Sequence, residues 1–467
     1  MTTTAALTEF TWHQEPKAEK LVHGIVDDVL RRVPFAGTLA QQMRDVSGTR
    51  IYDWIGHLSL KVGDPRIEQF DSVGYKQVTV EDGTRVFAND RGVFPRIITS
   101  TSRPVQVELA IKVDSVADFL AAHQVQTTIF GEPGANLRYA VVSTKDAAAL
   151  TVVERHGSTS FGSVEGDLKH NARAAHHLEQ FRTRLRALPV ADDARGFAIA
   201  DRLIDASIAE VGRDVTCDLF FNAEREFWTR RNRAAQVQYA RQNKLGLGWA
   251  NHDHHTYRSS RVGFKALVEV WEKLGLVCRE RFYAGLEAGW GAQVMEQPNT
   301  GIVTFNDVDL SPEELMGDFS HDGLAPKPAL GTVGLWCGLH GDSFLQAGMH
   351  HLECQFDFEQ LRLQLEQEHG IKTMKPFTDY SYLRQAFTEG ERFKVDGQRI
   401  DALLSAGLVT VEQGETFRVD GALGSHLENL ERNEGFKGFN QKGVSEIIAA
   451  TDPRKQTPMQ KPQLAGA

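Results

Sequence analysis

The sequence predicts an α+β protein made of tandem βαβββ units, which pair into two half-barrel domains and are interrupted by a helical insertion. Three observations favour this class. Short segments in which apolar and polar residues alternate recur along the chain, and segments with helical periodicity lie between them. This pattern fills two blocks, 51–160 and 249–456, and a stretch rich in Ala, Arg, Glu and Leu separates them. The 467 residues suffice for several domains and a large core.

Composition excludes several classes of function. Hydrophobic residues make up 41% of the chain and charged residues 24%, which is ordinary for a globular protein. The net charge of −10 argues against general nucleic-acid binding, because phosphate recognition needs a basic surface. The basic run 230–233 is read more simply as a solvated helix face.

Cysteine usage and the lack of a targeting signal point to an intracellular protein. No apolar run approaches the ~20 residues of a membrane helix, and residues 1–10 lack a basic-then-apolar signal pattern. The four cysteines include no Cys-x-x-Cys pair, which argues against a thiolate zinc site and fits a reducing compartment. We therefore expect a cytoplasmic protein with no membrane or nucleic-acid partner.

The N-terminal block begins with a helical segment over 1–50. Leu21, Ile25 and Val29 recur every fourth residue, which predicts one helix over 18–46. From Ile51 the alternation becomes strand-like and continues to Val62. Further strands are expected over 75–80, 84–88, 96–99, 105–113, 139–142 and 149–154, with a helix over 116–123. This order amounts to two βαβββ units, a pair expected to be non-catalytic.

The region 161–248 is predicted to be a helical insertion. It has few turn residues until Leu245-Gly246-Leu247-Gly248, which marks its end. The strand pattern resumes at His254 and predicts a second, catalytic pair of units over 249–456. The elements expected there are helices over 263–274, 358–369, 400–406 and 443–450, strands over 277–282, 292–296 and 302–306, a Pro- and Gly-rich loop over 311–334, and strands from His351 to Leu430. A mobile tail is expected over 457–467.

Two histidines and one glutamate near the edges of these strands carry the chemistry. His254, His351 and Glu428 offer two neutral imidazoles and a carboxylate, a facial set that holds non-haem Fe(II) in oxygenases and leaves the opposite positions open. Each has an alternative reading as a surface or core residue. His350 is the alternative metal ligand to His351, because adjacent strand residues point to opposite faces and only one of the two can face the site. Glu431 is the alternative to Glu428.

The sequence around these residues resembles a known family. Asp253-His254, Gly348-Met349-His350-His351-Leu352 and Glu428-x-x-x-Arg432 followed by Gly435-Phe436 and Asn440 are similar to segments of 4-hydroxyphenylpyruvate dioxygenase and its relatives in the vicinal oxygen chelate (glyoxalase-like) superfamily. The resemblance covers 250–456 well and 51–157 loosely. It implies the paired-unit fold, an Fe(II) cofactor and His254, His351 and Glu428 as metal ligands.

The chain also departs from that family. Arg418, in Gly414-Glu415-Thr416-Phe417-Arg418, stands where the family has a substrate-contacting Gln in a strand, and Asp420 replaces a Phe. Arg258, four residues after His254, resembles a second iron family, the 2-oxoadipate dioxygenase/decarboxylase (hydroxyglutarate synthase) type. There a His-x-x-x-Arg strand supplies a metal ligand and a clamp for a substrate carboxylate. Neither family pattern contains the helical insertion.

These features give a set of candidate substrate contacts. A guanidinium binds a carboxylate in a bidentate manner and is costly to bury without a partner. The two arginines therefore point to a polar or anionic substrate tail, whereas the alternative for each is a surface position. The alternative role for the asparagine at 306 is to form a turn. The alternative role for the phenylalanines is simple packing. The candidates are Arg258, Arg418, Asn306, Phe436, Phe439 and Asn440.

The N-terminal block offers His57, Glu108 and Glu154 at equivalent strand positions. They would form either a second metal site or, as the resemblance favours, a decayed duplicate with a structural role.

The resemblance and the residues together predict an Fe(II)-dependent dioxygenase that oxidatively decarboxylates a 2-oxo acid, with dioxygen as the second substrate. The alternatives are 4-hydroxyphenylpyruvate dioxygenase or its mandelate-forming variant, a metal-dependent isomerase or lyase, and a non-catalytic ligand-binding protein on the same fold. The intact His-His-Glu set argues against the last of these. A homo-oligomer is compatible with the sequence, which fixes neither the substrate nor the product.

Overall fold

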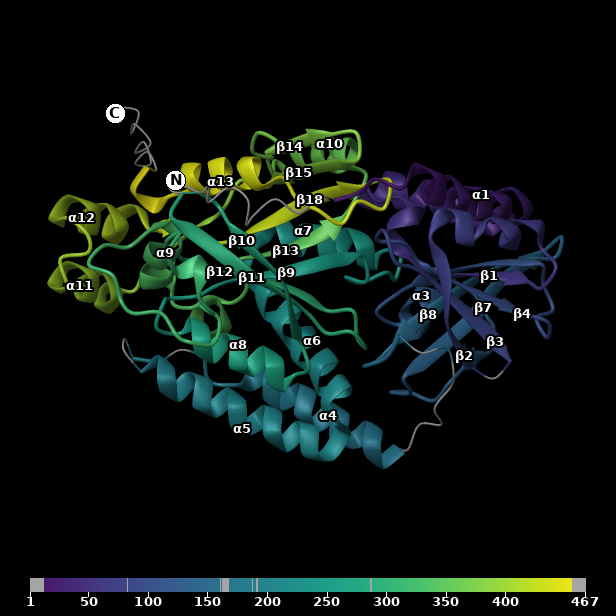
Figure 1. Cartoon of the computed structure of the whole chain (residues 1–467), viewed down its shortest axis with the longest axis horizontal. Coiled ribbons are helices and arrows are strands. Elements are labelled where there is room, and N and C mark those ends of the chain that lie inside the picture. The colour runs from purple at the N-terminus through teal and green to yellow at the C-terminus, as the bar shows by residue number, and fades with distance from the viewer. Residues whose placement is uncertain are drawn as a thin grey trace, which may run out of the picture.

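The computed structural model describes residues 12–81, 83–159, 161, 168–186, 188–189, 192–285 and 288–455 (Figure 1). Two mixed sheets of eight strands form the framework, and helices lie between them in the sequence. The tail expected over 457–467 lies outside the described residues.

The first sheet has the strand order β2-β3-β4-β1-β5-β8-β7-β6. In each half the opening strand pairs in parallel with the closing strand, β1 with β4 and β5 with β8, while β1 and β5 join the halves as antiparallel neighbours. The crossovers are two short 3-10 turns, η4 and η5, and the helix α3. The bounds are β1 (Ile55–Lys61), η4 (Pro65–Gln69), η5 (Asp71–Val73), β2 (Tyr75–Glu81), β3 (Thr84–Asn89), β4 (Arg96–Ser100), β5 (Val107–Lys112), α3 (Val116–Ala122), β6 (Ile129–Phe130), β7 (Leu137–Lys145) and β8 (Ala148–Arg155).

The second sheet repeats this topology in the order β10-β11-β12-β9-β13-β18-β15-β14. The expected α+β fold of four βαβββ units in two pairs is therefore confirmed. The bounds are β9 (His252–Arg258), α8 (Phe264–Lys273), β10 (Val277–Tyr283), β11 (Trp290–Glu296), β12 (Val303–Asp309), β13 (His351–Gln355), α10 (Phe358–His369), β14 (Thr378–Tyr380), β15 (Leu383–Phe387) and β18 (His426–Arg432).

Additional elements decorate the second pair. The helix α9 precedes β13, and a small two-stranded sheet with two helices is inserted between β15 and β18. The helix α13 follows β18. The bounds are α9 (Thr332–His340), β16 (Arg392–Phe393), α11 (Gly397–Ser405), α12 (Val411–Asp420), β17 (Ala422–Leu423) and α13 (Gln441–Ala450).

The helices between the sheets pack against the second pair of units, as the lower part of Figure 1 shows. Phe220 and Phe221 of α6 share one buried core with Tyr257 of β9 and Trp271 of α8. Burial of these large rings provides the main stabilisation, because each removes a large apolar area from water. The bounds are α4 (Leu168–Thr183), α5 (Asp193–Val211), α6 (Arg213–Arg231) and α7 (Arg233–Asn243).

The N-terminal helix is shorter than its periodicity predicts. Instead of one helix over 18–46, the chain forms α1 (Pro16–Arg32) and α2 (Pro34–Gln42). Val33 takes φ −105° and ψ 98°, an extended conformation. Proline at position 34 explains this break, because its ring disfavours helical backbone at the preceding residue. The apolar stripe of α1 is nevertheless buried as expected, with Leu21, Ile25 and Val29 in the first core.

The segment that follows β18 connects the two pairs. The backbone N–H of Glu15 donates to the carbonyl of Glu434 at 2.8 Å, and the Glu434 N–H donates to Oε1 of Glu19 at 2.6 Å. The Val93 N–H donates to the carbonyl of Gly435 at 2.8 Å. The N-terminal half therefore holds the end of a strand that belongs to the second sheet.

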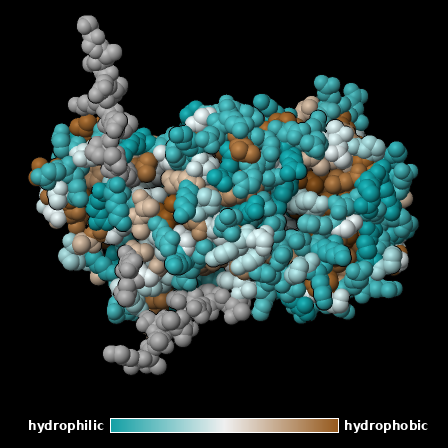
Figure 2. Space-filling model, turned by 90° about the horizontal axis from the view of Figure 1, so that it is seen from above, coloured by the Kyte–Doolittle hydropathy of each residue, from teal (hydrophilic) through white to brown (hydrophobic). Residues whose placement is uncertain are grey.

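Figure 2 shows one face covered mostly by hydrophilic residues, with hydrophobic ones scattered among them. Among the helices that the structure describes, none combines the length and apolar character of a membrane span.

Candidate metal centre

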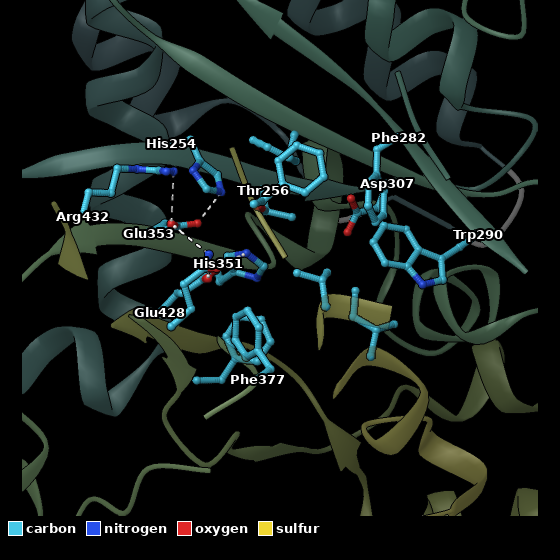
Figure 3. Close-up of a pocket in the computed structure, with 16 residues that line it drawn as sticks. His254, Thr256, Phe282, Trp290, Asp307, His351, Glu353, Phe377, Glu428 and Arg432 are labelled. Atoms are coloured by element: carbon cyan, nitrogen blue, oxygen red, sulfur yellow. Dashed lines mark hydrogen bonds and ion pairs between the residues drawn. The ribbon is translucent and has the colours of Figure 1, made fainter. Parts of the chain in front are cut away.

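Three adjacent strands at the centre of the second sheet bring the candidate ligands together. The register places Glu353 of β13 between His254 of β9 and Glu428 of β18, and places His351 in the next row. Residues paired across neighbouring strands, and residues two apart in one strand, share a face of the sheet. These four side chains therefore point into one pocket (Figure 3).

The expected trio is compact enough to hold one ion. One ligand atom each from His254, His351 and Glu428 lies within 4.8 Å of the others, and all three residues are buried. Nε2 of His351 is 2.9 Å from Oε2 of Glu428. Residues 97 and 77 positions apart along the chain thus converge on one point.

Glu353 is a further carboxylate that sequence reasoning missed. Its Oε2 lies 2.6 Å from Nε2 of His254, and the amide of Gln385 lies 3.2 Å from Glu428 Oε1 and 3.4 Å from Glu353 Oε1. The signal was present, since Glu353 follows His351 by two residues and so faces the same side of the strand.

The pKa shifts fit a cation site. Burial and the neighbouring His426 and His254 lower the pKa of His351 well below its usual value, so the ring stays neutral and free to ligate. Burial and the like charge of Glu353 raise the pKa of Glu428 well above the ordinary carboxyl range. Burial opposes protonation of His254, but Glu353 and Asp253 outweigh it and raise its pKa to about 9, so a bound divalent ion would take the place of this proton.

Outer contacts orient the two imidazoles. Nδ1 of His254 lies 3.2 Å from Oδ2 of Asp253, which in turn pairs with Arg432 at 3.2 Å. Nδ1 of His351 lies 2.9 Å from Nδ1 of His350. His350 also packs on Trp336, with ring centroids 5.0 Å apart. A carboxylate behind a ligating histidine is the usual device for fixing its ring and raising its basicity. Two imidazoles and one carboxylate of this kind fit Fe(II) and similar divalent metals.

The pocket above the donors is small and mostly apolar. Its volume is about 50 Å³. Aromatic rings form most of the wall, and helix α13 closes one side with Val444 and Ile448. The rings are those of Phe282, Trp290, Phe305, Phe377, Phe387 and Phe439. Such a wall excludes water from the metal donors.

Arg258 lies on the pocket face of β9 at its far end. It pairs in register with Asp307, which lines the pocket, and is only 1% exposed. Among the described residues, its Nε and Nη2 have no hydrogen-bond partner. The guanidinium carbon lies 5.6 Å from the centroid of the Trp336 ring. Burial raises the pKa of Asp307 to about 7, although Arg258 and His254 lower it. Arg258 is thus a buried cation with unused donors beside the lining residue Asp307, although it is not itself a lining residue.

Two predicted substrate contacts are wrong. Arg418 lies on helix α12 rather than on a strand, and its guanidinium pairs with Asp401 at the surface. A capping box between Thr410 and Gln413 starts this helix, which explains why the strand reading failed. Asn306 lies on β12, but its side chain faces the core, where it accepts a hydrogen bond from Trp271 Nε1 at 2.7 Å. Alternation sends Phe305 and Asp307 to the pocket instead.

Of the remaining predicted substrate contacts, one lines the pocket and two lie outside its lining. Phe439 lines the pocket. Phe436 is absent from the lining residues and packs with Leu383 and Leu430 in a separate cluster. Asn440 caps helix α13 by accepting from the Gly443 N–H at 3.1 Å, and it is also absent from the lining.

The N-terminal counterparts do not gather. Glu108 pairs with Arg103, and Glu154 contacts Arg138 at 3.0 Å and His156 at 2.8 Å. Within the described residues, His57, Glu108 and Glu154 form no metal-binding group. The reading as a structural duplicate is the one that these contacts favour.

Comparisons with known proteins give only remote likenesses. No protein-family model matches the chain, and no curated protein matches it. Among solved structures, a variant of 4-hydroxymandelate synthase from Streptomyces coelicolor is 13% identical, covers 86% of this chain and 98% of its own, and has a TM-score of 0.26. A putative glyoxalase superfamily protein from Ralstonia eutropha JMP134 is 12% identical, covers 59% and 99%, and has a TM-score of 0.33. Methylmalonyl-CoA epimerase from Mycobacterium tuberculosis is 12% identical, covers 39% and 87%, and has a TM-score of 0.22. Because these scores are low, the fold is described from the strand order and the site from its geometry.

Proposed function

We propose that the protein is an Fe(II)-dependent dioxygenase that oxidatively decarboxylates a 2-oxo acid with an anionic tail. The observation that carries this proposal is the convergence of His254, His351 and Glu428 within 4.8 Å in a buried, aromatic pocket. These three residues would hold the metal. When bound, the metal would supply open positions for the substrate and dioxygen together with the redox chemistry that no side chain provides.

The protein residues position the substrate and protect the reaction. The aromatic wall keeps water away from the donors. Arg258 is four residues beyond His254 on the same strand, which corresponds to a separation of ~13 Å between their Cα atoms. A substrate bound at the metal through its 2-oxo acid end would reach the unused N–H groups of Arg258 with a carboxylate at its other end.

One observation favours a second candidate. Six aromatic rings line the pocket, and a wall of this kind suits a planar aromatic substrate such as 4-hydroxyphenylpyruvate. The mandelate-forming variant of that reaction would use the same wall. Arg258 separates the candidates, because a phenolic tail would leave its Nε and Nη2 donors without a carboxylate acceptor.

Metal content and oxygen uptake test both candidates. We expect stoichiometric iron after anaerobic reconstitution, and oxygen consumption with 2-oxoadipate exceeding that with 4-hydroxyphenylpyruvate. The reverse order would favour the second candidate. Zinc, nickel or manganese without oxygen uptake on any 2-oxo acid would refute the dioxygenase and favour an isomerase or lyase.

A pair of matched variants ties the activity to the site. His351→Ala should lose both iron and turnover. His57→Ala changes the histidine at the third position of β1, which corresponds to His254 in β9, and should keep both. Iron retained in His351→Ala would contradict the ligand assignment, and iron lost in His57→Ala would point to a second site.

A further inference from the structure

A second cavity lies between the two pairs of units, apart from the metal pocket. Its volume is about 420 Å³, in the range of small-molecule sites. The N-terminal sheet, helix α6 and the residues around the start of β9 form its wall. None of its lining residues lines the metal pocket, so both can be occupied at once.

Two cationic side chains of this wall, Arg225 and Lys112, form no ion pair within the described residues. Arg225 of α6 is 6% exposed, and among the described residues its guanidinium forms hydrogen-bond contacts with neutral groups, Nε2 of His255 at 3.3 Å and Oδ1 of Asn222 at 2.5 Å. Lys112 of β5 forms no ion pair within the described part of the chain, and burial lowers its pKa. Arg96 of β4 donates to the carbonyl of Thr159 at 3.2 Å.

The acids in the wall are already engaged. Oδ2 of Asp114 accepts the backbone N–H of Trp249 at 2.7 Å. Asp218 lies 3.4 Å from Nδ1 of His156. Burial opposes protonation of His156, but Asp218 and Glu154 outweigh it and raise its pKa to about 10, so this ring is a further cation. The cavity therefore carries excess positive charge, although the whole chain has a net charge of −10.

We propose that this cavity binds a small anionic ligand through a phosphate or carboxylate group, held by Arg225 and Lys112. A buried guanidinium without an acidic partner is costly, and an anion would offset that cost with charge-assisted hydrogen bonds. The ligand would also touch the catalytic strand. Arg225 contacts His255, the neighbour of His254, and successive strand residues face opposite sides of a sheet. The anion site thus lies behind the metal centre, across β9.

Direct titration tests the site. Inorganic phosphate and succinate are titrated calorimetrically into the iron-loaded full chain at constant ionic strength, with chloride as the reference anion. The measurements are made in the Arg258→Gln background, which removes the buried guanidinium beside the metal pocket. Saturable binding of one probe is expected, and the probe that binds identifies the recognised group.

Variants locate the binding. Lys112→Met and Arg225→Gln should each weaken it about tenfold or more, the loss expected for one charged hydrogen bond. Arg202→Gln removes an exposed charge on α5 and should bind like the parent. Lys112→Met keeps the test valid if the buried Arg225 variant fails to fold. The proposal is overturned if neither probe binds at about 10 mM, where even a millimolar site is mostly filled, or if both cavity variants bind like the parent.

Discussion

Replacing Arg258 by Met should make the substrate-free protein more stable and its catalysis worse. Arg258 is buried, and two of its nitrogens lack hydrogen-bond partners within the described residues. Each unsatisfied buried donor costs about 1–3 kcal/mol. The contact with Trp336 returns about 0.5–2 kcal/mol, and attraction to Asp307 returns part of the rest. Methionine reproduces the unbranched aliphatic part of the arginine side chain without its charge, so we expect a net gain of ~1–3 kcal/mol in the free energy of unfolding.

The same change should remove the clamp for the substrate tail. Loss of a charged, bidentate contact of about 3 kcal/mol corresponds to a fall of ~100-fold in kcat/KM for a dicarboxylic 2-oxo acid. Urea unfolding of the metal-free protein measures the first effect, and oxygen uptake measures the second. A monocarboxylic 2-oxo acid serves as the reference substrate, and its kcat/KM should change much less.

Arg261 provides the matched control. It is also buried, but its guanidinium donates to the carbonyls of Ala325 and Asp309, both at 2.7 Å, and pairs with Glu314. Arg261→Met should therefore lower the free energy of unfolding by about 3 kcal/mol or more, since it strands these partners. The reasoning would be refuted if Arg258→Met were as destabilising as Arg261→Met while kcat/KM stayed unchanged.

Three further outcomes can be measured. Burial raises the pKa of Asp307 to about 7, so the stability that this group contributes is full below its unfolded pKa and is lost as pH rises through about 7. Asp307→Asn should remove this pH dependence of the free energy of unfolding, up to roughly 1.4 kcal/mol per pH unit between about pH 4 and 7. Urea unfolding measures it, and equal pH dependence in parent and variant would contradict the prediction. Arg418→Gln should leave kcat/KM within about twofold for every 2-oxo acid, because Arg418 pairs with Asp401 at the surface; a shift towards aromatic tails would place it in the pocket. Glu428→Gln should lose iron, whereas Glu353→Gln should weaken iron binding about 10–100-fold, the usual effect of an outer-shell change; metal analysis showing the opposite order would make Glu353 the ligand.

Much of the fold could be predicted because period-two alternation and turn residues are local signals. They gave the four units and, with the resemblance, the strands that carry His254, His351 and Glu428. The predictions failed where a shift of one residue along a strand decides which face of the sheet a side chain occupies. Asn306 was placed in the pocket, although its neighbours Phe305 and Asp307 occupy that face, and Glu353 was overlooked although it shares a face with His351.

Other features depend on contacts between distant parts of the chain. Arg418 was read as a strand residue from its likeness to a family segment, while the capping box that starts α12 was not weighed. The cationic cavity joins Lys112 of the first sheet to Arg225 of the helical region, more than a hundred residues further on. No local sequence pattern predicts that these two residues lie close together, because their proximity arises only when α6 packs between the two halves.

The bridge after β18 bears on how this protein can be divided. A fragment starting at residue 249 would contain every proposed ligand, yet Glu434 and Gly435 would lose the backbone partners at Glu15 and Val93 that secure them. Glu428 lies six residues upstream, so fraying from that end would propagate towards the iron donors. The N-terminal pair of units thus holds the end of β18 in place. Removing that pair would leave this end of the strand that carries Glu428 without its backbone partners.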